Sequence, residues 1–223
     1  MNALYFITGT DTGAGKTVLS ALLARWLQRS AVRVAALKPL CSGGRDDAQV
    51  LQTALRGALA LNEINPWHFR AVVAPALAAR REKKSVSLQE VSTHIRAVQK
   101  KFEITLVEGA GGLLSPLGQN FDSRDLIIKL QATPIIVAQN KLGAVNHLLL
   151  TLAALPENLR ARARIVLMSP PKADAASRSN AALLGEFFPP AKIFTLPWLG
   201  LTFSTNPVLK RPALRRKLEN ILK

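Results

Sequence analysis

The segment at residues 9–17, Gly-Thr-Asp-Thr-Gly-Ala-Gly-Lys-Thr, is the feature that most restricts the fold of this chain. It follows an apolar run at residues 4–7 and precedes leucines at helical spacing from Val18 onward. A strand, a glycine-rich turn and Gly-Lys-Thr at a helix start are the context of a phosphate-binding loop. Backbone N–H groups of such a turn point toward phosphate oxygens, assisted by the helix N-terminus. The segment therefore predicts a nucleotide-binding α/β fold.

The chemistry of this loop is carried by its last two residues. Lys16 supplies a positive charge for the phosphates, and the hydroxyl of Thr17 is a suitable ligand for Mg²⁺. The spacing is slightly irregular, because five residues separate Gly9 from Gly15 and Thr10 occupies the usual first-glycine position. The alternative is a glycine turn that only joins a strand to a helix. It is disfavoured because Gly-Lys-Thr at this junction is more specific than scattered glycines.

Length and composition are those of one globular domain spanning residues 1–223. Hydrophobic residues make up 48% of the chain and charged residues 20%, which is typical of a folded core. No apolar run approaches the roughly 18 residues of a membrane span. Residues 4–7 run directly into the loop, so we expect a first strand and not a signal peptide. The single cysteine, Cys41, cannot form an internal disulfide, which favours a reducing cytoplasm.

The net charge of +16, from 30 Lys and Arg against 14 Asp and Glu, raises the question of a nucleic-acid or anionic-membrane partner. The basic residues are scattered, however, and aromatic residues that stack on bases make up only 5%. We therefore expect a cationic, solvated surface that attracts anionic substrates, and no specific nucleic acid. Apolar residues at 214, 218, 221 and 222 have helical spacing, which predicts a packed terminal helix rather than a membrane anchor.

Strands and helices are predicted to alternate along the chain. Near-continuous apolar strands separated by helices indicate a parallel sheet with helices on both faces. Ser87 and Glu90 form a capping box that predicts a helix start, whereas residues 62–86 are expected to be loop-rich. Further strands are expected at residues 31–37, 103–107, 133–138, 164–168 and 192–196. Helices are expected from 46 or 47 to 61, from 87 to about 101, from about 143 to 155, and from 177 to 187.

Ligands of parallel sheets bind beyond the carboxyl ends of the strands, so the residues that follow each strand are the candidate site. Glu108 ends an apolar strand and precedes Gly-Ala-Gly-Gly, which leaves space for a ligand. Asp46 and Asp47 follow the second strand, and either one serves as a metal ligand while its neighbour caps a helix. With Thr17, these oxygens predict a Mg²⁺ site. Lys38, at the same edge, implies an anionic acceptor beside the γ-phosphate, which is typical of phosphoryl transfer to a carboxylate-like group.

Five motifs, taken together, resemble the dethiobiotin synthetase family. They are Gly-Thr-Asp-Thr-x-x-Gly-Lys-Thr at 9–17, Lys-Pro with Ser-Gly at 38–43, Val-Glu-Gly-Ala-Gly-Gly at 107–112, Lys-Leu-Gly with Asn-His at 141–147, and Leu-Pro-Trp at 196–198. The resemblance extends from residue 4 to about residue 199. It implies a single-domain P-loop NTPase-like fold and a homodimeric, ATP- and Mg²⁺-dependent cyclo-ligase of biotin synthesis. In that reaction 7,8-diaminononanoate is carboxylated on nitrogen by CO₂, the carbamate is phosphorylated, and the ureido ring closes.

The same resemblance implies roles for single residues. Lys16, Lys38 and Thr12 correspond to catalytic groups around the phosphates and the carbamate, and Ser42 corresponds to a carbamate-contacting serine. The metal ligands would be Thr17, Asp47 and Glu108, which favours Asp47 over Asp46. Nucleotide contacts are implied for Gly13, Ala14, Gly15, Lys16, Thr17, Val18, Glu108 and Pro197.

The distal carboxylate of the substrate is expected at a helix start donated by the partner subunit. The resemblance places Gly143, Ala144 and Asn146 there, and free N–H groups at a helix N-terminus favour a carboxylate. His147 is adjacent and is assigned no role. A departure from the family lies at residues 169–171, Ser-Pro-Pro, where an adenine-reading Asn is common, so nucleotide selectivity is left open.

Three alternatives belong to other classes. A ParA- or MinD-like partitioning ATPase, which binds DNA or membrane, would suit the basic charge, but such proteins usually carry a second lysine where this chain has Asp11. An amide ligase of cobalamin-type synthesis normally needs a glutaminase domain, which is not expected in 223 residues. A degenerate binding protein is disfavoured because the proposed lysines, threonine and carboxylates are all present.

Overall fold

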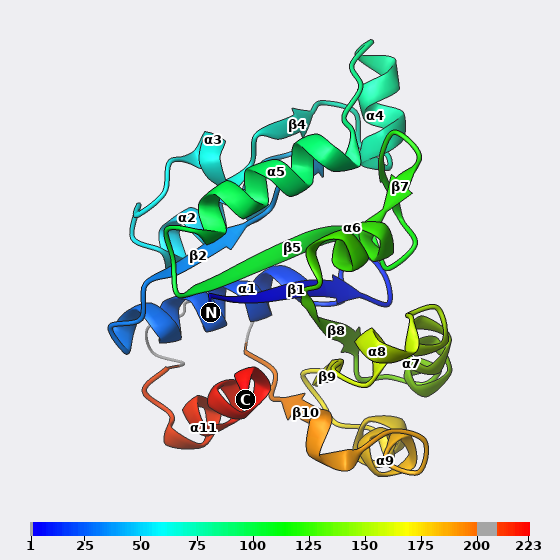
Figure 1. The fold of residues 1–223 in the computed structure, drawn as a ribbon. Helices are drawn as coiled ribbons and strands as arrows, with labels where there is room; N and C mark the ends of the chain where they lie inside the picture. Colours follow the sequence, from blue (N-terminus) through cyan, green and yellow to red (C-terminus); the bar gives the residue numbers. More distant parts are fainter. Residues whose placement is uncertain (1, 200–208) are drawn as a thin grey trace.

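A parallel β-sheet forms the centre of the molecule in the computed structural model, which describes residues 2–199 and 209–223. Six strands lie in the order β10-β9-β8-β1-β5-β2, and each pairs in parallel with its neighbours (Figure 1). The predicted fold class is therefore confirmed. The strands are β1 (Ala3–Gly9), β2 (Val34–Leu37), β5 (Ile104–Gly112), β8 (Thr133–Gln139), β9 (Arg164–Met168) and β10 (Ile193–Leu196).

Helices cover both faces of this sheet, because its strands are apolar on both sides. In Figure 1, α5 and α6 lie in front of β5 and β1, while α1 lies behind them. Side chains such as Phe6 and Ile7 of β1 and Leu106 of β5 are fully buried between these layers. The helices are α1 (Lys16–Arg29), α2 (Asp46–Ala54), α3 (Leu61–Ile64), α4 (Pro75–Arg81), α5 (Leu88–Gln99), α6 (Ser123–Leu130), α7 (Ala144–Ala153), α8 (Glu157–Arg160), α9 (Ala175–Leu184), η1 (Pro190–Lys192) and α11 (Pro212–Leu222).

Two helix predictions are confirmed with their physical cause. The Ser87 hydroxyl accepts from the Glu90 N–H, and the Glu90 carboxylate accepts from the Ser87 N–H, which is the predicted capping box at the start of α5. Helix α11 packs against α1 and β10 through Leu214, Leu218 and Ile221, so it is a packed terminal helix. No helix in the described parts of the chain has the length and apolarity needed to cross a membrane.

Several predicted boundaries are wrong for local reasons. The helix expected to reach residue 61 ends at Ala54, because Arg56 and Gly57 take positive φ angles of 53° and 75°. Its N-cap is Arg45 without a side-chain cap, so neither aspartate caps it. The strand expected from residue 31 begins only at Val34, after Ala31 at a φ of 59°.

The segment at residues 62–86 is more ordered than predicted, and small elements were missed elsewhere. It contains the end of α3, strand β4 and helix α4, although loops join them. Helix α6 and the short α8 were also not predicted. Two two-stranded sheets complete the fold: β3 (Leu40–Ser42) with β4 (Trp67–Phe69), and β6 (Pro116–Gly118) with β7 (Phe121–Asp122).

Strand register brings the predicted site residues together. Ile7 of β1 pairs with Glu108 of β5, and Leu37 of β2 pairs with Val107. Lys38 therefore leaves β2 directly beside Glu108, and the phosphate loop begins two residues after Ile7. The parallel arrangement alone gathers these three turns at one edge of the sheet.

Candidate active site

The phosphate loop connects β1 to α1 in a conformation that its glycines make possible. Gly13 and Gly15 have φ angles of 67° and 97°, and Gly15 is the N-cap of α1. A Cβ on Gly15 would lie 2.9 Å from the Cγ of Met168, and at this φ an L side chain is strained, so both the space and the backbone favour glycine. The loop therefore presents its backbone N–H groups at the positive end of a helix, which favours an anion.

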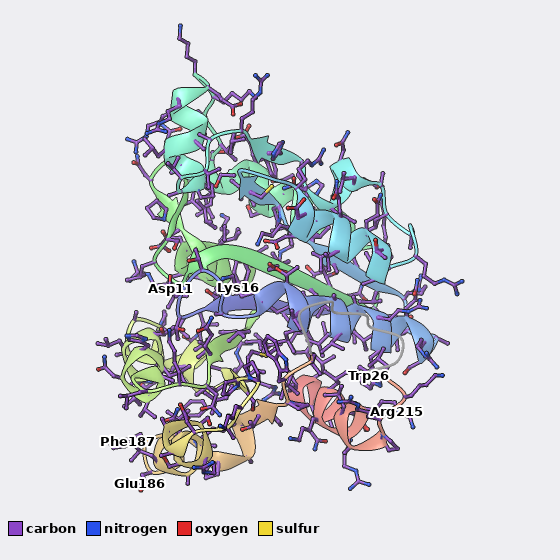
Figure 2. The ribbon with its side chains drawn as sticks, turned by 180° about the vertical axis from the view of Figure 1, so that it is seen from behind. Asp11, Lys16, Trp26, Glu186, Phe187 and Arg215 are labelled. Atoms are coloured by element: carbon purple, nitrogen blue, oxygen red, sulfur yellow. The ribbon has the colours of Figure 1, made fainter. Side chains whose placement is uncertain are left out.

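Lys16 lies under this loop and is almost fully buried. Its ammonium donates to the carbonyl of Asp11 at 2.9 Å, and Figure 2 shows the two residues together at the edge of the sheet. Burial lowers the pKa of Lys16 to about 8, and the nearby ammonium of Lys38 acts in the same direction. A phosphate beside Lys16 would offset both effects, because an opposite charge favours the protonated amine.

Lys38 is the second buried cation, and three acceptors surround it. Its Nζ lies 2.7 Å from Oε1 of Glu108, 2.9 Å from Oδ2 of Asp47 and 3.0 Å from the carbonyl of Gly109. Burial opposes the charged form of Lys38, but the two carboxylates outweigh it and raise its pKa above the ordinary value. Burial likewise acts to raise the pKa of Asp47, and Lys38 overrides it to give a lowered value.

The three predicted metal ligands meet at one point. The Thr17 hydroxyl lies 2.9 Å from Oδ1 of Asp47 and 2.8 Å from Oε1 of Glu108. It has one proton, so it donates to only one of these oxygens at a time. The second carboxylate oxygen of Glu108 is buried without a hydrogen-bond partner among the described residues. This surplus of hard oxygen acceptors fits Mg²⁺.

The geometry distinguishes Asp46 from Asp47 as the candidate metal ligand. Asp47 contacts Thr17 and Lys38, whereas Asp46 is exposed in the first turn of α2. The described residues contain no group of three or more His, Cys, Asp or Glu side chains arranged for a metal. Two carboxylates and one hydroxyl are what a Mg²⁺ ion needs when substrate phosphates and water complete its shell.

A cavity of about 690 Å³ opens above Lys16, Thr17 and Lys38. Thr12 and Ser42, to which the resemblance assigns roles at the phosphates and the carbamate, also line it. The Ser42 hydroxyl donates to the carbonyl of Val73, so it is already fixed in direction. An apolar wall completes the cavity. It consists of Val72, Val73, Ala74 and Pro75, which connect β4 to α4, and the sequence did not predict it.

A second cavity of about 480 Å³ lies on the other side of the loop. It shares Gly13, Gly15 and Val18 with the first, and Ala14 and Pro197 line it as well. The residues predicted to contact nucleotide thus divide between two adjoining cavities. Glu108 lines neither of these two cavities and lies beneath the first one, in contact with Thr17 and Lys38.

The start of α7 is not part of the first cavity. Gly143, with a φ of 88°, is the N-cap of α7, and Gly143 and Asn146 are exposed while Ala144 is buried. None of these three residues lines the cavity of Lys38 within the same chain. Leu142 and Leu150, on either side of them, are 86% and 63% exposed.

Asn65 is a buried residue of the site that sequence reasoning missed. Its Nδ2 donates to the carbonyl of Lys38 at 2.7 Å, and its Oδ1 accepts from Nε of Arg45 and the thiol of Cys41, both at 3.1 Å. The only local signal was the Asn-Pro pair at residues 65–66, which predicts a turn and not a contact with residue 38. The cysteine is free and buried.

Comparisons with known proteins show which sequences this chain is similar to. A family model described as an AAA domain matches residues 4–202. The ATP-dependent dethiobiotin synthetase BioD of Anaeromyxobacter dehalogenans is 38% identical over 198 residues, covering 86% of this chain and 89% of that one. The BioD of Methanococcus vannielii is 34% identical over 148 residues, covering 66% of this chain and 70% of that one.

Solved structures reproduce the fold at low sequence identity. A ParA family ATPase from Chlorobium tepidum superposes with a TM-score of 0.60 and 15% identity, over 96% of both chains. At this identity the likeness shows a shared P-loop architecture and nothing about DNA or membrane binding. The sequence relatives therefore favour the dethiobiotin synthetase class over the ParA- or MinD-like class, which the basic charge had left open.

Proposed function

This chain belongs to the dethiobiotin synthetase family, and on that premise we propose that it is the ATP-dependent cyclo-ligase that forms the ureido ring of dethiobiotin. Its substrates are 7,8-diaminononanoate, CO₂ and ATP, and its place in metabolism is biotin biosynthesis. The free, buried thiol of Cys41 is in keeping with the cytoplasmic location expected from the sequence.

The nucleotide is held across the two cavities, with its phosphates on the loop. Backbone N–H groups of Gly13–Gly15 and the ammonium of Lys16 bind the β- and γ-phosphates. Thr17, Asp47 and Glu108 would hold Mg²⁺, and the ion would supply charge neutralisation at the phosphoryl group undergoing transfer. The ammonium of Lys38, which contacts Glu108 and Asp47 in this structure, lies at the floor of the cavity where the acceptor would bind.

The second substrate lies in the cavity above Lys38, against the apolar wall of Val72–Pro75. One amine of the diamine attacks CO₂ and gives up a proton to solvent, which leaves a carbamate anion. The carbamate oxygen attacks the γ-phosphorus and ADP departs. The second amine then displaces phosphate from the carbonyl carbon and releases its proton to solvent or to the departing phosphate, which closes the ring. Lys38 orients the carbamate and its positive charge stabilises it, and the Ser42 hydroxyl adds a hydrogen bond once it turns from the Val73 carbonyl to the carbamate. Thr12, at the rim of the same cavity, contacts the transferred phosphoryl group.

The distal carboxylate of the substrate binds at the start of α7 of a second subunit. Gly143, Ala144 and Asn146 lie outside the cavity of their own chain, which supports assigning them to the site of a neighbouring copy. The exposed side chains of Leu142 and Leu150 provide apolar area for such a contact. We propose a homodimer in which each site takes its carboxylate-binding turn from the partner.

One observation carries this proposal: two buried lysines, two carboxylates and one threonine converge beneath a phosphate loop. The test is incubation of the purified protein with 7,8-diaminononanoate, ¹³C-bicarbonate, Mg²⁺ and ATP. We expect ¹³C in the ureido carbon of dethiobiotin by mass spectrometry, with ADP, phosphate and product formed in equal amounts. ATP hydrolysis without labelled product, or hydrolysis stimulated by DNA or lipid vesicles, would show that the assignment is wrong.

A further inference from the structure

The turn at residues 140–143, between β8 and α7, contacts both ends of the proposed reaction site, and this inference rests on the proposed function. Gly143 is the N-cap of α7, the helix start assigned to the substrate carboxylate of a neighbouring copy. Just before the turn, Gln139 donates through Nε2 to the carbonyl of Gly13, in the phosphate loop of its own chain, at 2.9 Å. The position of this turn therefore decides where the carboxylate is held.

Most of the turn has no buried side chain to fix its position. Lys141, Leu142 and Gly143 are exposed, and Leu142 is 86% exposed. Asn140 is the exception, because only 2% of its surface is exposed. Asn is seldom buried to this extent, and a buried amide needs hydrogen-bond partners within the protein.

The Asn140 amide bonds to helix α9. Its Nδ2 donates to the carbonyl of Ser177 at 2.8 Å, and its Oδ1 accepts from Nδ2 of Asn180 at 2.9 Å. Asn180 is 6% exposed, and its Nδ2 also donates to the carbonyl of Lys141 at 2.9 Å. Because the carbonyls of Ser177 and Lys141 can only accept, both amides are fixed in orientation. Asn140 and Asn180 thus form a buried amide pair that joins the turn to α9.

Helix α9 is a firm support for this amide pair. The carboxylate of its N-cap, Asp174, accepts from the N–H of Ser177 at 2.7 Å, and Leu184 at its other end is fully buried. The helix packs against α7 and β10, and Figure 1 shows it next to β10 with α7 above it. Loss of the amide pair should therefore displace the exposed turn and leave α9 in place.

We propose that Asn180 is a positioning residue for the diamine substrate. Through Asn140 and the carbonyl of Lys141, it sets the helix start that holds the substrate carboxylate in the neighbouring site. A hydrogen bond to a charged group changes affinity by about 10- to 100-fold, so misplaced N–H groups at this helix start have an effect of that size. The phosphates of the nucleotide bind to other groups, so nucleotide affinity is kept.

The test compares Asn180→Asp with the wild type on two diamines that differ in one group. They are 7,8-diaminononanoate and 2,3-diaminooctane, which is the same molecule without its carboxylate and closes to the corresponding cyclic urea. Asp has nearly the shape of Asn but no N–H to donate, and its charge repels the two oxygens that Asn180 binds.

The expected loss is confined to the carboxylated substrate. For 7,8-diaminononanoate, kcat/KM should fall by about 10- to 100-fold, mainly through a higher KM. For 2,3-diaminooctane it should change by less than about threefold, because no carboxylate is there to be misplaced. The Kd of ADP, measured by calorimetry, should also stay within about threefold of the wild-type value.

Two further variants control for changes in folding. Asn180→Ala removes the same donors without adding a charge, and it provides the comparison if the Asp variant does not fold. Ser179→Ala is the matched control, because Ser179 is exposed on the same helix and its hydroxyl donates to the carbonyls of Ala175 and Ala176 within that helix. It should leave kcat/KM for both diamines unchanged. Thermal unfolding of all three variants is measured in parallel.

The outcomes separate this inference from the proposed function. Equal losses on both diamines, or a preference for the carboxylated diamine equal to that of the wild type, would overturn the positioning role while the proposed function stands. A wild-type protein that forms no dethiobiotin would overturn both, and that result is recognised without any variant.

Discussion

Lys38 is buried, and its ion-pair partners are carboxylates that the proposed reaction also requires. Its side chain is 4% exposed and bridges Glu108 and Asp47, which are the proposed metal ligands. Removing one partner of a buried ion pair leaves the other charge uncompensated, at a cost of about 3–5 kcal/mol when both are fully buried. Stability and catalysis are therefore coupled at this residue, and experiments on it must measure both.

We predict that Lys38→Ala lowers the rate of ring closure by about 100- to 1,000-fold or more, because a charge that stabilises the acceptor is lost. Nucleotide affinity should be largely kept, since Lys16 and the loop bind the phosphates. Steady-state kinetics and ADP titration calorimetry check the two halves, with exposed Lys84→Ala as the control. Loss of nucleotide affinity with normal turnover at saturation would contradict the assigned role.

Glu108→Gln keeps the shape of the side chain and removes its charge. We expect a higher Mg²⁺ concentration at half-maximal activity and a turnover reduced by about two orders of magnitude or more. The matched control is Glu103→Gln, an exposed carboxylate just before the same strand, paired with Arg33 on the surface. An unchanged Mg²⁺ profile in the Glu108 variant would remove this residue from the metal site.

Asn65 positions Lys38 without touching the substrate cavity. Asn65→Ala leaves the Lys38 carbonyl without this partner and frees the Nε of Arg45, so it should cost about 1–3 kcal/mol of unfolding free energy. It should also lower kcat more than it raises the KM for ATP. Asn62→Ala is the control, because Asn62 accepts from the same arginine at the surface and should change stability by less than about 0.5 kcal/mol. Urea unfolding and kinetics measure these effects, and equal changes in the two variants would count against a positioning role.

At the scale of elements, the last helix is joined to the fold by a narrow apolar stripe. Figure 2 shows α11 beside α1 on the back of the sheet, in the region of Trp26 and Arg215. Leu214, Leu218 and Ile221 are buried there, and the opposite face of the helix is charged and exposed. Most of the stability of this helix must come from that packing, because an isolated helix of this length is marginal in water.

Leu218→Ala should therefore destabilise the protein by about 2–5 kcal/mol, since the side chain is fully buried and the space cannot easily close. Arg215→Ala, on the exposed face of the same helix, should change the unfolding free energy by less than about 0.5 kcal/mol. Chemical denaturation compares the two variants. A Leu218 variant as stable as the Arg215 variant would mean that α11 contributes little to the folded state.

The helices and strands also show which elements a local sequence pattern is sufficient to predict. Strand β9 begins and ends where predicted, and helix α11 contains the predicted apolar stripe, because a short apolar run and a stripe at helical spacing are local signals. Helix α2 ended early at a backbone turn with positive φ that the pattern did not reveal. The small sheet of β3 and β4 depends on pairing between residues far apart in sequence, and no local pattern predicts it.

At the scale of the whole molecule, the site is proposed to be shared between two copies, and this is testable. Mixing Lys38→Ala with Asn146→Asp subunits gives heterodimers that, under the proposed sharing, each contain one intact site. The new carboxylate of Asn146→Asp repels the substrate carboxylate, so each parent should be nearly inactive. Random mixing should restore about a quarter of wild-type activity. No recovery, although mass spectrometry shows mixed dimers, would place both groups in the same chain.

The sequence by itself determined the fold class, the phosphate loop and the candidate side chains around it, because these follow from local chemistry: glycines that permit a tight turn, a lysine and threonine at a helix start, and polar residues directly after apolar strands. The tertiary structure decided which of them meet. Strand register brought Lys38 against Glu108, and the placement of α2 and of the turn after α3 put Asp47 beside both and Asn65 behind Lys38. It also left the start of α7 outside its own cavity. Such distances depend on how strands far apart in sequence pair and how helices pack on them, which no single segment encodes.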